Sequence, residues 1–344
     1  RYPVYFAESI DALADNIKEV RPTVFFAVPR VWEKFHAGVS ARLGEATGVK
    51  AKLADWAQNV GRQAVEHRNR GEEPGGLLGV QYRLASKLVH HKVKEALGMD
   101  ACRFAVSGAA PIDASVLEFF SGFDLPIYEV YGQSEGSGPT TFARPGRAKF
   151  GTVGPPYPGA EVRIADDGEI LLKGGMIFEG YWQNEEATAE TLVGDGWLAT
   201  GDIGTIDDDG FLRITGRKKH LIVTAAGKNV APAVLEDAVK ASPLVSQVVV
   251  VGDQQPFIAA LVTLDVEELA RWAEAKGAHA SAPGELTREL LDDDGDDLHN
   301  EVAAAVEEAN RRVSRAESIR EFRILSSDFT IESGELTPTL KVKR

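Results

Sequence analysis

The stretch DGWLATGDIGTIDDDGFLRITGRKK, residues 195–219, decides the fold. Within it, Ile203–Ile206 and Phe211–Ile214 alternate apolar with polar or small residues around the run Asp-Asp-Asp-Gly, which predicts a β-hairpin. Because a hairpin brings its two ends together, Asp202 before the first strand and Arg217 after the second can flank one ligand. A carboxylate can accept hydrogen bonds from two adjacent ribose hydroxyls, and Arg donates a planar fork. For an isolated Asp and Arg, a surface salt bridge at the base of a hairpin would be the preferred interpretation.

The same stretch resembles the long motif shared by fatty-acyl-CoA synthetases of the adenylate-forming superfamily, which includes luciferases and peptide-synthetase adenylation domains. So many matching positions in one run make the signal specific, unlike a lone glycine motif. The resemblance implies that Asp202 holds the ribose hydroxyls of ATP and that Arg217 contacts the ribose or a phosphate. It also places Lys219 at a hinge. The hinge would join the C-terminal portion of a large AMP-binding domain, residues 1–218, to a small mobile domain, residues 219–344.

Composition describes an ordinary globular protein that is long enough for more than one domain. The net charge of −14 argues against nucleic-acid binding, which needs clustered Lys and Arg, and against a polybasic membrane anchor. The single Cys102 excludes an internal disulfide and fits a reducing compartment. No apolar run approaches the ~20 residues of a membrane span, and the first residues lack a signal-peptide pattern. We therefore expect a cytoplasmic protein, with peripheral membrane contact left open and the oligomeric state unknown.

The first hundred residues alternate helix and strand in the manner of an α/β fold. Residues 9–20 place apolar side chains on one helical face, and the apolar run Thr23–Val28 predicts a strand buried on both faces of a parallel sheet. Val28 and Trp32 follow at the end of that strand, where open α/β sheets bind ligands. The resemblance implies that they border an acyl pocket, and a core position for Trp32 is equally compatible with the sequence. Residues 37–100 carry two apolar helical stripes; long-chain synthetases are similar in having a helical insertion here, which favours a long acyl substrate.

Small residues follow the predicted strand Arg103–Val106 and would let the backbone approach a flat ligand closely. The resemblance implies that this loop covers one face of adenine. Its members are Gly108, Ala109, Ala110 and Pro111.

A second loop follows the strand that begins at Leu125–Tyr128 and reads Tyr-Gly-Gln-Ser-Glu. An aromatic ring at Tyr131 can stack on a base, the Ser134 hydroxyl can bond a phosphate oxygen, and the Glu135 carboxylate can hold a hard cation. A surface loop with an ordinary Ser and Glu would look the same. The run, Gly132 included, matches the superfamily's second nucleotide motif, which implies those roles, with Mg²⁺ at Glu135.

After Lys219 the pattern changes to that of a small α+β domain. The predicted elements are a short strand at Leu221–Val223, a helix at Pro232–Lys240, strands at Val245–Val251 and Phe257–Leu264, and an amphipathic helix over Leu298–Val313. The resemblance implies that a loop in this domain faces the thioester site once the small domain has swung about the hinge. The loop contains Ala225, Ala226 and Gly227.

The last residues, Leu336–Arg344, match a near-terminal loop of the superfamily, and the resemblance implies that Lys341 reaches the α-phosphate of ATP. A compact ammonium on a flexible stem suits the stabilisation of charge on a pentavalent phosphorus. The superfamily's glycine-rich phosphate loop, which ends in Pro-Lys-Gly, does not occur in this sequence. We therefore expect the chain to be the second half of a large sheet-and-helix adenylating domain followed by a small α+β domain.

The reaction implied by the resemblance joins a long-chain fatty acid to CoA, with ATP, Mg²⁺ and CoA as co-substrates. A carboxylate would attack the α-phosphorus of ATP to give an acyl-adenylate and pyrophosphate, and CoA would then displace AMP. Ser134, Glu135 and Lys341 would serve the chemistry. Two other functions fit the same motifs: an adenylate-forming ligase with a different acceptor, and a non-catalytic nucleotide- or acyl-binding protein.

Overall fold

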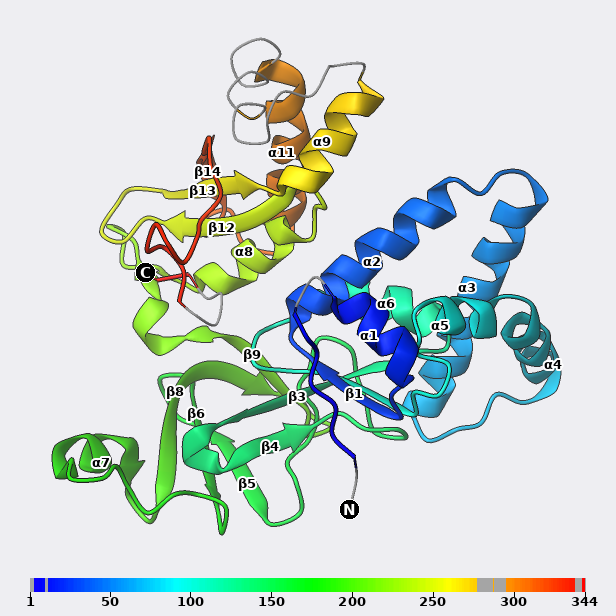
Figure 1. Cartoon of the computed structure of the whole chain (residues 1–344). Helices are drawn as coiled ribbons and strands as arrows, with labels where there is room; N and C mark the ends of the chain where they lie inside the picture. Colours follow the sequence, from blue (N-terminus) through cyan, green and yellow to red (C-terminus); the bar gives the residue numbers. More distant parts are fainter. Residues whose placement is uncertain (1–2, 10–11, 277–286, 288–294, 338–341, 344) are drawn as a thin grey trace. The chain divides into compact units, whose positions relative to one another are not determined.

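The computed structural model of the chain describes residues 3–9, 12–276, 287, 295–337, 342 and 343 (Figure 1). It confirms the predicted α/β class, because the described strands form four sheets and are interspersed with helices. The chain folds into two compact units. The first comprises Arg1–Thr200 and Gly204–Ile214, and the second comprises Gly201–Ile203 and Thr215–Arg344.

The first unit contains a sheet of four strands, β1 (Val24–Ala27), β2 (Phe104–Ser107), β3 (Ile127–Gln133) and β4 (Gly138–Phe142). They lie in the order β1-β2-β3-β4, with β2 parallel to both β1 and β3, and β4 antiparallel to β3. Helices connect the parallel strands, which is the α/β arrangement that the sequence predicts.

Strand β1 corrects one prediction, because it is not buried on both faces. Phe25 and Ala27 point into the core, whereas the side chains between them point outward: Val24 is 61% and Phe26 57% exposed. Among the described residues β1 pairs with β2 alone, and α2 (Pro29–Gly44) and α6 (Ala114–Gly122) cover its core side. A short, continuously apolar run cannot by itself reveal that only one face is covered.

Helices occupy most of residues 37–100. After α1 (Leu13–Val20) and β1, helix α2 begins directly at Pro29, because proline suits the first position of a helix. The elements that follow are α3 (Val49–Asn69), α4 (Gly76–Ala85), a π-helical turn η1 (Ser86–His90) and α5 (His91–Ala96).

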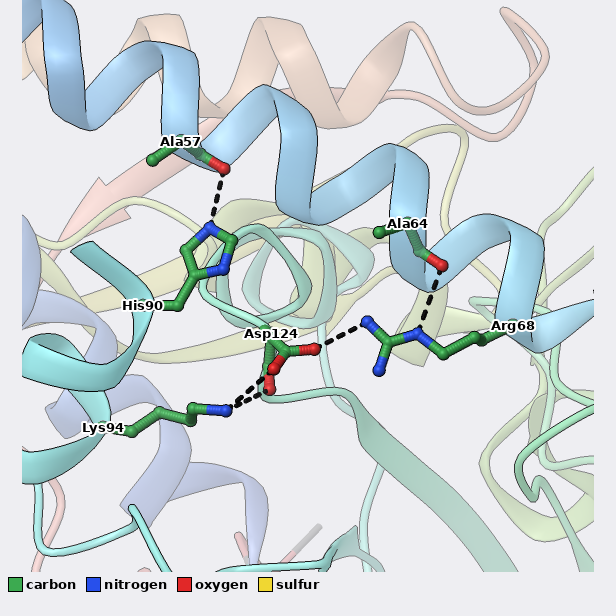
Figure 2. A network of polar contacts seen from close by, with 6 residues as sticks. All are labelled: Ala57, Ala64, Arg68, His90, Lys94 and Asp124. Carbon is green, nitrogen blue, oxygen red and sulfur yellow. Dashed lines mark hydrogen bonds and ion pairs between the residues drawn. The ribbon is translucent and has the colours of Figure 1, made fainter. Parts of the chain in front are cut away.

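A buried carboxylate links these helices to the turn before strand β3 of the four-stranded sheet (Figure 2). Asp124, in the turn between α6 and β3, accepts hydrogen bonds from Arg68 Nη2 at 2.6 Å and from Lys94 Nζ at 2.8 Å. Nearby, His90 Nε2 lies 2.8 Å from the carbonyl oxygen of Ala57 on α3. A carbonyl only accepts, so Nε2 carries the proton, and burial lowers the pKa of His90 and favours the neutral ring.

A second sheet lies mostly in the first unit, and it contains the hairpin that the sequence predicts around the run Asp-Asp-Asp-Gly. Its strands are β5 (Ala160–Ile164), β6 (Glu169–Gly174), β7 (Leu192–Val193), β8 (Trp197–Ile206) and β9 (Leu212–Arg217), with α7 (Glu185–Thr191) before β7. The strand order is β5-β6-β8-β7, and β9 pairs with β8. The turn of the β8–β9 hairpin is fixed by Asp207, whose Oδ1 accepts from the backbone N–H groups of Asp209 and Phe211.

The second unit is a small α+β domain, as predicted. It contains a short hairpin, β10 (Ile222–Val223) and β11 (Asn229–Val230), followed by α8 (Pro232–Lys240), β12 (Val245–Val251), β13 (Ile258–Leu264), α9 (Val266–Ala275), α11 (Gly295–Asn310) and β14 (Ile319–Ile324). Strands β12 and β13 are antiparallel, and β14 lies parallel to β13 on its other side. Helix α9 and strand β14 were not among the predicted elements. Pairing of β14 with β13 joins residues far apart in the chain, which local patterns do not report.

Candidate functional site

Asp202 and Arg217 are in direct contact, although Asp202 lies within β8 and not before the first strand of the hairpin as the sequence predicts; Arg217 is the last residue of β9. Arg217 Nε donates to Asp202 Oδ1 at 2.8 Å, and the two side chains are 56% and 8% exposed respectively. Gly201 supplies the left-handed backbone that precedes Asp202, at φ 72°. The pair is therefore a salt bridge at the base of the hairpin. The buried Asp202 carboxylate is thus held in one orientation by an accessible guanidinium. The roles expected of Asp202 and Arg217 toward a nucleotide stay predictions.

The Tyr131–Glu135 segment runs from the end of β3 into the turn before β4, where Ser134–Gly136 form one turn of 3₁₀ helix. Gly132 is required for packing, because an added Cβ would lie 1.9 Å from the carbonyl oxygen of Gly138. The Tyr131 ring is buried in a core cluster with Ile170, and Ser134 is exposed. The roles expected of Tyr131, Gly132 and Ser134 toward a nucleotide stay predictions.

Glu135 is anchored by contacts with the segment that follows β6. Its backbone oxygen accepts from the N–H of Phe178 at 2.8 Å, and its Oε1 accepts from the hydroxyl of Tyr181 at 2.8 Å. No group of three or more His, Cys, Asp or Glu side chains capable of holding a metal occurs among the described residues. Mg²⁺ commonly binds one or two carboxylates together with substrate phosphates and water. One carboxylate therefore fits a cation that arrives with a nucleotide.

The loop after β2 combines packing with backbone strain. An added Cβ at Gly108 would lie 2.7 Å from Val130 Cγ1, so packing against β3 already explains this glycine. Ala109 has φ 72°, a left-handed conformation that is uncommon for a residue with a side chain. Ala109, Ala110 and Pro111 are exposed. Strained backbone of this kind clusters at functional sites, and the role of the loop at an adenine face stays a prediction.

Val28 and Trp32 lie at the start of α2 with very different exposure. Val28 is the partly exposed residue before the helix, whereas Trp32 is fully buried, and its Nε1 donates to the carbonyl oxygen of Val106 at 3.3 Å. The Trp32 ring packs edge-on against Phe25 and Phe120. The structure thus places Trp32 in the core, and an acyl chain could reach it only if these rings moved. The acyl-pocket role of both residues stays a prediction.

In the second unit, Lys219 is exposed in the 3₁₀ turn Lys218–His220. The exposed loop Ala225, Ala226 and Gly227 connects β10 to β11, with Gly227 at φ 77°. Thr224 braces it, because its N–H donates to the carbonyl oxygen of Lys228 at 3.0 Å and its Oγ1 accepts from the Lys228 N–H at 3.2 Å. The hinge and thioester roles stay predictions. Lys341 lies outside the described residues.

One buried ionisable group in the first unit was not identified from the sequence. Glu129, two residues before Tyr131 on the same face of β3, is almost fully buried, and burial raises its pKa to about 8. A hydrogen bond from the N–H of Gly151 and the charge of Arg213 oppose that rise. At neutral pH the carboxyl is therefore mainly protonated. Its only sequence signal is a single acid within the apolar run Ile127–Val130.

The sequence matches two family models. Residues 3–182 match the family model described as AMP-binding enzyme, and residues 219–343 match the AMP-binding enzyme C-terminal domain. The long-chain-fatty-acid–CoA ligase FadD15 of Mycobacterium tuberculosis is 48% identical over 342 residues, which cover 99% of this chain and 55% of the relative. The long-chain-fatty-acid–CoA ligase ACSBG2 of Gallus gallus is 38% identical over 366 residues, 99% of this chain and 47% of that protein. The chain thus spans about half the length of these relatives.

Solved structures with the same fold share far less sequence. The A-PCP didomain of the carboxylic acid reductase from Segniliparus rugosus, in complex with AMP, has a TM-score of 0.62 at 23% identity over 99% of this chain and 42% of that one. The O-succinylbenzoate CoA synthetase MenE of Bacillus subtilis, in complex with ATP and magnesium ion, has a TM-score of 0.55 at 20% identity over 92% of this chain and 51% of that one. These likenesses support the fold assignment. Because the AMP-binding enzyme model alone spans more than half of the sequence, this chain belongs to the AMP-binding enzyme family.

Proposed function

We propose that the chain carries the nucleotide-binding and small-domain parts of an AMP-forming ligase that activates a long-chain fatty acid and transfers it to CoA. The Asp202–Arg217 pair carries the proposal, because it fixes a buried carboxylate beside an accessible guanidinium in a member of the AMP-binding enzyme family. The relatives named long-chain-fatty-acid–CoA ligases support the choice of acyl substrate and acceptor.

The proposed reaction has two displacement steps. In the first, a carboxylate oxygen of the fatty acid attacks the α-phosphorus of ATP, and the bond to the β-phosphate oxygen breaks to release pyrophosphate. In the second, the sulfur of CoA attacks the acyl carbon, and the carbon–oxygen bond to AMP breaks. Asp202 accepts hydrogen bonds from the ribose hydroxyls and Arg217 donates to the ribose or phosphate oxygens. Lys341 stabilises the charge that develops on the α-phosphate.

The nucleotide's other contacts are assigned to the first unit. Tyr131 and the loop Gly108–Pro111 enclose adenine, and the hydroxyl of Ser134 donates to a phosphate oxygen. Glu135 would hold the Mg²⁺ that arrives with ATP, and that ion would supply neutralisation of the phosphate charge. Every described residue among these belongs to the same compact unit.

We also propose that Lys219 is the hinge between the large and small domains and that the small domain rotates about it between the two steps. Lys341 then serves the first step, and the loop Ala225–Gly227 faces the thioester site in the second. Such an exchange is a conformational step that can limit turnover. Lys219 is exposed in a short 3₁₀ turn, which fits a segment that changes its backbone angles.

The experiment that tests this function follows pyrophosphate release by the chain from ATP and palmitate, together with AMP binding by calorimetry. Pyrophosphate release that requires palmitate, with AMP bound, supports the ligase. AMP binding without pyrophosphate release favours a non-catalytic nucleotide-binding role. Acyl-adenylate formation followed by transfer to an amine or a carrier protein, and not to CoA, favours a ligase with another acceptor.

We propose a cytoplasmic location with peripheral contact to anionic membranes through α4. No helix among the described residues is long and apolar enough to cross a membrane. One side of α4 and η1 is nonetheless apolar and exposed, with Leu77, Val80 and Leu84 at helical spacing. Arg83 and Lys87 are exposed next to them, which is the charge pattern of a helix that lies on an anionic surface.

Replacing both Leu77 and Leu84 with Asp is expected to abolish sedimentation of the chain with phosphatidylglycerol–phosphatidylcholine vesicles. Two buried apolar contacts are lost and two like charges are added to the lipid surface. Val49→Asp, at an exposed apolar position outside α4, is the matched control and should sediment as the wild-type chain does. The proposed membrane contact is contradicted if the wild-type chain does not sediment with the vesicles, or if the double variant still does.

A further inference from the structure

The sequence Gly180-Tyr181-Trp182 lies between β6 and α7. In the structure the hydroxyl of Tyr181 reaches Oε1 of Glu135, the proposed cation-binding carboxylate, at 2.8 Å. The two residues are 46 positions apart in the chain. Only the folded arrangement of the first unit brings them together.

Contacts of its backbone and of its ring both hold Tyr181 in place. Its backbone N–H donates to Thr188 Oγ1 at 2.9 Å, and Thr188 Oγ1 donates to the carbonyl oxygen of Asn184 at 2.7 Å. Its ring packs edge-on against Phe178, with centroids 4.8 Å apart. Gly180 allows this approach, because at φ 150° an added Cβ would lie 2.7 Å from Thr188 Cγ2.

The segment that carries Tyr181 is also joined to the Glu135 turn through its backbone. Phe178 N–H donates to the carbonyl oxygen of Glu135 at 2.8 Å, and Ser137 Oγ donates to that of Met176 at 2.7 Å. The turn and the segment are therefore fixed relative to each other before the Tyr181 hydroxyl is considered. The phenol–carboxylate bond adds a restraint on the side chain alone.

That restraint has a consequence for cation binding. A free glutamate side chain samples several rotamers, and ordering it on binding opposes the binding. A neutral phenol that donates to Oε1 selects one orientation and leaves the carboxylate its negative charge, so Oε2 remains able to bind a cation. A lysine or arginine in the same place would instead compete with the cation.

We propose that Tyr181 is a positioning residue that orients Glu135 for the Mg²⁺ bound with ATP. The inference rests on the proposed role of Glu135 and adds a residue that does not itself touch the metal or the reacting atoms.

The test compares the wild-type chain with its variants, each saturated with ATP. The quantity compared is the affinity for Mn²⁺, a paramagnetic probe for Mg²⁺. Tyr181→Phe keeps the ring and its contact with Phe178 but removes the hydroxyl. We expect Mn²⁺ binding, measured by electron paramagnetic resonance, to weaken roughly five-fold, as loss of about 1 kcal/mol of preorganisation implies. Tyr157→Phe, whose ring stacks on Phe142, is the matched control and should leave the affinity unchanged.

If Tyr181 only stabilised the fold, Tyr181→Phe would lower the thermal midpoint of the chain or its affinity for ATP in the absence of metal. We expect Tyr181→Phe to change neither quantity. Glu135→Gln separates the two hypotheses. If Glu135→Gln does not weaken Mn²⁺ binding, the proposed metal role of Glu135 fails and this inference fails with it. If Glu135→Gln weakens binding and Tyr181→Phe does not, the positioning role alone is wrong. In the Glu135→Gln background, Tyr181→Phe should have no further effect.

Discussion

Asp124→Asn is expected to destabilise the first unit by about 3 kcal/mol, because it leaves two cations without their shared carboxylate in a mostly buried place. Asp124 accepts from Arg68 on α3 and from Lys94 on α5, and its side chain is 9% exposed. Burial by itself would raise the pKa of Asp124, but Lys94 and Arg68 together hold it below its usual range. Asn preserves the left-handed backbone at this position, which has φ 58°.

Urea unfolding measures the loss, and hydrogen exchange of α3 and α5 peptides localises it to this contact. The matched control is Asp15→Asn, which breaks an exposed pair with Lys18 and should cost no more than about 0.5 kcal/mol. Because the folded-state pKa of Asp124 is depressed, its contribution is complete above the unfolded pKa, roughly 3.9, and is lost as the pH falls through the lower folded-state value. The wild type and Asp124→Asn should therefore converge in strong acid. Equal losses in the two variants at neutral pH would show that the carboxylate does not join the helices.

Lys341→Ala is expected to slow acyl-adenylate formation by about 10²–10³-fold when the chain is joined to the amino-terminal half that its relatives carry. That is the typical loss when one preorganised group that stabilises transition-state charge is removed. Transfer to CoA from supplied acyl-adenylate should fall far less, because no charge develops on the phosphorus in that attack. Single-turnover assays of the two half-reactions measure both rates.

Lys343→Ala is the matched control for Lys341→Ala, because it removes a neighbouring ammonium and keeps the backbone bond from Lys343 N–H to the carbonyl oxygen of Glu335. It should slow neither half-reaction. Equal slowing of adenylation and transfer by Lys341→Ala would remove Lys341 from its assigned role and indicate a general effect of the terminal segment.

The contrast between Asp202 and Glu135 shows how much of the site was predictable from sequence. Asp202 and Arg217 lie on the two strands of one hairpin, at similar distances from its turn, so local alternation and a turn sequence are enough to predict their contact. The bond from Tyr181 to Glu135 depends on tertiary packing over a long sequence separation, and no local pattern reports it. The burial of Glu129 likewise depends on tertiary packing, and the local sequence does not predict it.

The elements of the fold likewise differ in how well the sequence predicts them. Helix α8 and strand β12 have the predicted bounds because their apolar periodicity is local and flanked by clear breaks. The sequence does not predict the exposed face of β1, because burial of that face depends on what packs there. It does not predict β14, because its parallel partner β13 is distant in the chain.

The central claim is that Asp202, oriented by Arg217, holds the ribose of the nucleotide. A carboxylate that accepts from both ribose hydroxyls should make the chain prefer AMP over 2′,3′-dideoxy-AMP by roughly 10- to 100-fold, the range for hydrogen bonds to a charged group. Asp202→Asn should remove most of that preference. Asp209→Asn, at the exposed far end of the same hairpin, should retain it.

Calorimetric titration of the wild type and both variants with the two nucleotides measures this coupling directly, since the comparison cancels effects that are common to both ligands. The account predicts discrimination in the wild type and in Asp209→Asn, and its near-complete loss in Asp202→Asn. Equal affinity of the wild-type chain for the two nucleotides, or undiminished discrimination by Asp202→Asn, would contradict it.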